Sequence, residues 1–80
     1  MQTLVRVSMT MPEMLDIIEQ NPNYESYLFE YEEFAIKLTR IFDSGWICRA
    51  SCGNVTVIME RMVGPKCAIV DMVKVIDCLP

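Results

Sequence analysis

A two-residue turn signal in the second half of the chain constrains the fold more than any other feature. Gly53 and Asn54 separate two segments in which side chains alternate between two faces, and such a pair is typical of a tight β-hairpin. In that register one face collects apolar side chains and the other is mixed. The apolar face would hold Trp46, Cys48, Ala50, Cys52, Val55, Val57 and Met59, and the mixed face Ile47, Arg49, Ser51, Thr56, Ile58 and Glu60.

Local signals predict a helix over about residues 11–20. Thr10 and Glu13 have the spacing of a capping box. Pro12 falls in the first turn, where backbone N–H groups have no acceptor within the helix, so its missing N–H costs no hydrogen bond. Residues 5–9, which precede this helix, alternate between apolar and polar and predict a strand with one buried face.

Residues 24–42 are predicted to form a second helix, after a break at residues 21–23. Their aromatic and aliphatic side chains recur at helical spacing. A strand is the alternative, and it requires a break at Glu32 and Glu33. That alternative would place Phe34, Ile36 and Leu38 on one face.

The last segment, residues 67–78, is rich in Val and Ile and is predicted to be a strand. The spacing of Asp71, Lys74 and Asp77 keeps a helical alternative open. The predicted fold is therefore α+β, in one domain spanning residues 1–80. Its order is β-α-α-β-β-β, with an antiparallel sheet of three to four strands and two helices packed on one face.

Four cysteines and the absence of histidine limit the chemistry. Cys48 and Cys52 would lie roughly 13 Å apart on one strand, beyond disulfide reach, and the spacings to Cys67 and Cys78 do not match a zinc site. We expect reduced, mostly buried thiols, no metal and no cofactor. No phosphate loop and no activated nucleophile is visible, so we expect that the chain is not an enzyme.

Charge is distributed unevenly along the chain. Between Val7 and Ile36 there are seven acidic residues and no Lys or Arg, and the net charge is −4. We expect a negative surface that attracts a basic protein and repels nucleic acid. The sequence shows neither a signal peptide nor an apolar stretch of membrane-spanning length, so we expect a cytoplasmic protein without membrane contact.

The helical phase of residues 24–42 predicts a partner-binding site. It turns Phe29 and Ile36 away from the core, and Glu25, Glu32 and Glu33 surround them. An apolar anchor inside a charged rim is typical of a protein contact. We expect a binding module that acts by occupancy: an inhibitor, regulator or adaptor that covers a basic surface of its target. Small phage inhibitors and nucleic-acid charge mimics have this format.

The uncovered side of the sheet supplies the alternative function. Ile47, Ile58 and Ile69 are predicted to line it, and together they exceed the apolar area that a monomer normally exposes. This predicts a homodimer through that face or through an edge strand, in which the chain is a structural subunit or an obligate homo-oligomer. The alternative is that the C-terminal segment folds across this face.

Overall fold

The computed structural model describes residues 9–41, 45–61 and 64–79. These residues form a meander of four antiparallel strands, with one helix before it and one helix after it in the chain. The strands lie in the sheet in their sequence order. The α+β class is confirmed, but the predicted order β-α-α-β-β-β is wrong. The elements are α1 (Met11–Gln20), β1 (Ser26–Tyr31), β2 (Phe34–Ile41), β3 (Gly45–Cys52), β4 (Val55–Arg61) and α2 (Pro65–Asp77).

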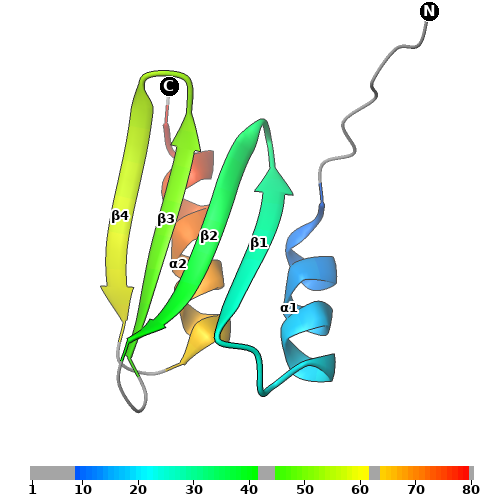
Figure 1. The fold of residues 1–80 in the computed structure, drawn as a ribbon. Coiled ribbons are helices and arrows are strands. Elements are labelled where there is room, and N and C mark those ends of the chain that lie inside the picture. The colour runs from blue at the N-terminus through cyan, green and yellow to red at the C-terminus, as the bar shows by residue number, and fades with distance from the viewer. Residues whose placement is uncertain (1–8, 42–44, 62–63, 80) are drawn as a thin grey trace, which may run out of the picture.

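The two helices lie side by side on one face of the sheet, although they come from opposite ends of the described chain (Figure 1). The predicted packing of two consecutive helices is therefore wrong. α2 packs against β2, β3 and β4, and α1 packs against α2 and lies next to β1. The core between these layers contains Met14, Ile18, Tyr27, Phe29, Ile36, Leu38, Trp46, Cys48, Ala50, Ala68, Ile69, Met72, Val73 and Ile76.

Helix α1 begins and ends where its local signals predict, at Met11 and Gln20. The capping box is present, because Glu13 Oε1 accepts from the Thr10 N–H at 2.9 Å and the Glu13 N–H donates to Thr10 Oγ1 at 3.4 Å. The bonds from Thr10 hold the pKa of Glu13 below its usual value. The strand predicted over residues 5–9 lies outside the described residues except for Met9, which is not in a strand.

The predicted helix over residues 24–42 is wrong, and the structure shows the strand alternative with its break at Glu32 and Glu33. β1 and β2 form a hairpin in which Phe29 pairs with Ile36 and Tyr31 with Phe34. Its loop is Glu32 and Glu33, both at positive φ, +49° and +70°. Aromatic and β-branched residues favour strands. This segment contains so many apolar residues that they fit the 3.6-residue spacing of a helix as well as the two-residue spacing of a strand.

The predicted strand over residues 67–78 is also wrong, because Pro65–Asp77 is helix α2. Pro65 is the first residue of the helix, where a backbone N–H would have no acceptor within the helix, so its missing N–H costs no hydrogen bond. The β-branched residues lower helix propensity by only a few tenths of a kcal/mol each, and burial of one stripe outweighs that. The buried stripe consists of Ala68, Ile69, Met72, Val73 and Ile76.

The β3–β4 hairpin has the predicted register. Cys52 pairs with Val55 across the loop, and Gly53 has a φ of +58°. Cys48 and Ala50 are fully buried under α2. Their small side chains let the helix approach the sheet closely, which a larger pair would prevent.

Candidate functional site

The predicted partner-binding residues do not assemble. Phe29 is only 3% exposed and Ile36 is completely buried, so the prediction that they point outward is wrong. The reason is the period: in paired strands both side chains fall on the face covered by the helices. Glu25 precedes β1 and Glu32 and Glu33 follow it, so the predicted rim is split by roughly 20 Å of extended chain.

The predicted isoleucine face is only partly present. Ile58, 62% exposed, and the half-buried Ile47 lie on the uncovered side of the sheet, but Ile69 is buried in α2. The prediction is therefore wrong for Ile69. Lys37 and Arg49 are paired across the two central strands of the same face. This surface has a cationic centre, with Leu28 paired to Lys37 on one side and Ile58 paired to Arg49 on the other.

A groove of about 660 Å³ opens at the end of the molecule where both hairpin loops and the end of α2 meet, which is the upper end in Figure 1. Phe34, Ile76 and Val55 give it an apolar lining, and the last of these is 46% exposed. Three segments far apart in sequence build it: the β1–β2 loop, the β3–β4 loop and the C-terminal end of α2. The full lining is Glu32, Phe34, Cys52, Val55, Ile76, Asp77 and Leu79.

The charge of this groove is negative. Glu32 and Asp77 line it, and among the described residues that do so none is basic. The C-terminus of α2 adds the negative end of a helix dipole. Tyr31 fixes one of the carboxylates, since its hydroxyl donates to Asp77 Oδ1 at 2.7 Å. That bond, together with partial burial, raises the pKa of Tyr31 to about 12.

The cysteines differ in exposure. Cys48 is buried, and desolvation raises the pKa of its thiol to about 12. Cys52 is half-buried and lines the groove. Cys67 and Cys78 are exposed, so the expectation of mostly buried thiols is wrong for these two. Within the described ranges no three His, Cys, Asp or Glu side chains gather closely enough to hold a metal ion.

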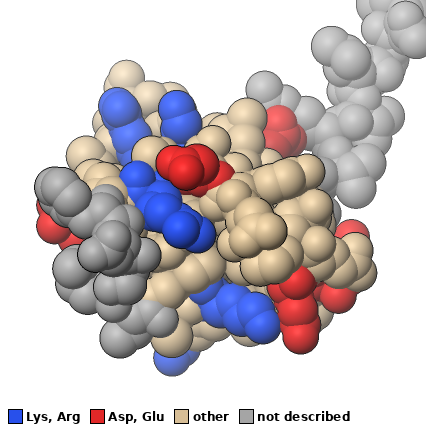
Figure 2. All heavy atoms as spheres, turned by 60° about the horizontal axis from the view of Figure 1, so that its bottom comes forward, with Lys and Arg blue, Asp and Glu red and all other residues tan. Residues whose placement is uncertain are grey.

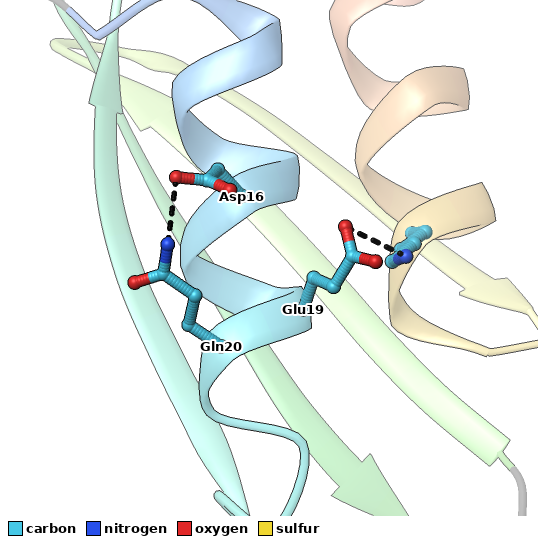
Figure 3. Close-up of polar contacts among 4 residues, drawn as sticks. Asp16, Glu19 and Gln20 are labelled. Atoms are coloured by element: carbon cyan, nitrogen blue, oxygen red, sulfur yellow. Dashed lines mark hydrogen bonds and ion pairs between the residues drawn. The ribbon is translucent and has the colours of Figure 1, made fainter.

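At the other end of the molecule the charges are mixed. Figure 2 views the end where α2 begins, and Lys and Arg gather over its middle and left with Asp and Glu beside them and along the right. On α1, Glu19 points toward α2 and lies 3.6 Å from Lys66 Nζ, while Asp16 accepts from Gln20 at 3.0 Å (Figure 3). Both partners of the ion pair are exposed, so it contributes at most about 1 kcal/mol. The acidic residues of α1 therefore have local partners.

Comparison of the chain with models of known protein families, with curated proteins and with solved structures gives no significant match. Neither described helix has the length and apolar content needed to cross a lipid bilayer.

Sequence reasoning missed most of this groove. Glu32 is predicted to bind a partner, but Phe34 is placed only on the face of the alternative strand, Asp77 enters only through its helical spacing, and Ile76 has no predicted role of its own. A local pattern cannot reveal the groove, because its three segments meet only when α2 packs across the sheet. The available signal was the helical alternative for residues 67–78, which places Asp77 at a helix end.

Proposed function

We propose that the protein is a binding module that acts by occupancy, and that the groove takes a basic, partly apolar segment of a partner protein. The observation that carries this proposal is the combination of an apolar lining with two carboxylates, that of Glu32 in the β1–β2 loop and that of Asp77 at the C-terminal end of α2. Inhibitor, regulator and adaptor are all forms of this function.

A Lys or Arg side chain matches this combination. Its aliphatic stem can lie on Phe34, Val55 and Ile76, while its charged head reaches the carboxylates at the rim. The helix terminus adds about 0.3–1 kcal/mol for a cation at a partly exposed position. An acidic segment would be repelled by the same groups. An uncharged segment would bury apolar area without using the rim.

Occupancy requires no chemistry in the groove. The chain contains no histidine. Among the residues that line the groove, Cys52 carries a thiol, which is the strongest potential nucleophile there. Among the described residues that line the groove there is no Lys or Arg to stabilise the thiolate of Cys52. The groups that line the groove can recognise charge and shape, and we assign them that role.

The test is a titration of the ¹⁵N-labelled protein with a short peptide of alternating Arg and Leu, followed by NMR. We expect shifts centred on Glu32, Phe34, Val55 and Asp77. The same peptide with citrulline in place of Arg keeps the shape and loses the charge. We expect it to bind about tenfold more weakly, the equivalent of about 1.4 kcal/mol.

Two variants locate the effect. Glu32→Gln combined with Asp77→Asn removes both rim charges and keeps an acceptor for Tyr31. Glu33→Gln removes one charge from the same loop at a position that does not line the groove. We expect the double variant to lose most of the preference for Arg over citrulline and the control to keep it. Equal binding of the two peptides to the native protein, or shifts centred on another surface, would overturn the proposal.

A further inference from the structure

The two edges of the sheet differ in how they are closed. At β1, the backbone N–H of Met9 donates to the carbonyl of Glu30 at 2.8 Å, and α1 lies alongside (Figure 1). At β4, no described residue pairs with the outer edge. A row of backbone N–H and C=O groups is therefore available there for another strand.

Over residues 55–59, strand β4 lacks the features that usually protect an edge, and its two charged residues, Glu60 and Arg61, lie at its end. Its register with β3 runs without a bulge from Val55 to Arg61, it contains no proline, and residues 55–59 carry no charge. Ile58 in its middle is 62% exposed. A long, regular and largely apolar edge of this kind invites pairing with a further strand.

We propose that β4 pairs antiparallel with β4 of a second copy, about a two-fold axis at Ile58, so that the two sheets of four strands form one continuous sheet of eight. When a two-fold axis relates an antiparallel pair of strands, the helix-covered faces of both copies lie on the same side of the joined sheet. Each residue then faces one that points to the same side of the sheet. Centred on Ile58, all seven residues of β4 find a partner. Any other register allowed by this symmetry pairs fewer.

The pairing at this register is chemically compatible. Ile58 meets Ile58 of the second copy, Thr56 meets Glu60, and Val57 meets Met59, so no like charges among these lie opposite each other. Val57 and Met59 are only partly buried in one copy. In the dimer, Val57 of each copy would cover Met59 of the other on the helix side of the sheet. This contact adds apolar burial to the backbone hydrogen bonds.

The uncovered face itself is a poor surface for self-association. Two copies packed face to face would bring Lys37 and Arg49 of one against the same cations of the other, which is repulsive. Edge pairing separates the two copies of Arg49 by three strand spacings, roughly 14 Å. That exceeds the Debye length of about 8 Å at physiological salt. Charge therefore favours the edge over the face.

The test is analytical ultracentrifugation of the native protein from roughly 1 µM to roughly 1 mM, with one disruptive variant and one matched control. Ile58→Glu places a carboxylate opposite Arg49 within the chain, which is favourable, and opposite its own copy across the axis, which is repulsive. Leu28→Glu, on β1, makes the same change at the other end of the same cross-strand row, opposite Lys37 on β2. We expect the native protein and the Leu28→Glu variant to dimerise and Ile58→Glu to stay monomeric.

A mixture provides the rescue. Ile58→Lys alone should also be monomeric, and an equimolar mixture of Ile58→Lys and Ile58→Glu should form heterodimers, because opposite charges then meet on the axis. Rescue also shows that neither variant has lost its fold. A native protein that stays monomeric over the whole range, a dimer that persists in Ile58→Glu, or a dimer that Leu28→Glu disrupts instead would overturn the proposal. None of these outcomes bears on peptide binding in the groove.

Discussion

The β1–β2 and β3–β4 hairpins both have two-residue loops, but they differ in the backbone conformation of the loop and in the size of the side chains that they bury. In the first, Glu32 and Glu33 both have positive φ, a conformation that costs a residue with a Cβ roughly 1–2 kcal/mol. In the second, only Gly53 has positive φ, at little steric cost. The first hairpin buries Tyr27, Phe29, Ile36 and Leu38, and the second buries Trp46, Cys48 and Ala50.

This difference shows how a small domain distributes strain. Within the sheet, the hairpin with the unfavourable loop contributes most of the large buried side chains, and their burial holds the loop closed. The hairpin with the favourable loop contributes mainly small side chains and leaves room for α2. The first hairpin should therefore depend on its core and the second on its turn.

The largest expected effect concerns the core of the first hairpin. Phe29→Ala should destabilise the protein by about 3–5 kcal/mol, because it removes a buried ring and leaves a cavity. Val57→Ala, at a partly buried position of the second hairpin, should cost about 1 kcal/mol. Urea denaturation measures both. Nearly equal losses would show that the two hairpins share the core evenly.

Substitutions in the two loops should act in opposite directions. Gly53→Ala should cost about 1–2 kcal/mol through its backbone alone, because a Cβ at this position meets nothing within 4 Å. Glu33→Gly should instead stabilise by up to about 1 kcal/mol, because it relieves a φ of +70°. Thermal melts of both variants provide the measurement, and a stabilising Gly53→Ala would refute the assigned turn.

Thiol labelling compares burial in the second hairpin with the exposed helix ends. Cys67 and Cys78 should react with a thiol reagent in the native protein, Cys52 more slowly, and Cys48 only after unfolding. Mass spectrometry after timed labelling identifies each site. Rapid labelling of Cys48 would mean that β3 separates from α2 more readily than its packing implies.

A further set of effects appears only at alkaline pH. Tyr31 has a folded pKa of about 12 against a usual value near 10. Its contribution to stability is therefore complete below pH 10 and is lost as pH rises through about 12. Burial gives Cys48 the same folded pKa, about 12, against a usual value near 8.5, so its loss begins earlier.

Denaturation curves from pH 8 to 12 separate the two groups. Tyr31→Phe should remove the part of the alkaline loss that begins near pH 10, and Cys48→Ala the part that begins near pH 8.5. A Tyr31→Phe variant with an unchanged pH profile would show that the bond to Asp77 does not form in solution.

The groove could be anticipated from sequence only at Glu32, since the other lining residues come together through tertiary packing. The fold was anticipated where a few neighbouring residues act on one another. For residues 24–41 and 67–77 the sequence favours the opposite secondary structure from the one they adopt, and in each case the structure matches the alternative that the spacing leaves open.

The sequence by itself determined the ends of α1 and the register of the β3–β4 hairpin. Thr10 with Glu13, and Gly53 at its positive φ, act within three or four residues along the chain. Only the tertiary structure decided between helix and strand for the segments that became β1–β2 and α2. Both contain apolar residues at two periods, and intrinsic propensities differ by less than about 1 kcal/mol per residue. Burial of Phe29 and Ile36 beneath the helices, and of Ile69 and Met72 against the sheet, outweighs that difference.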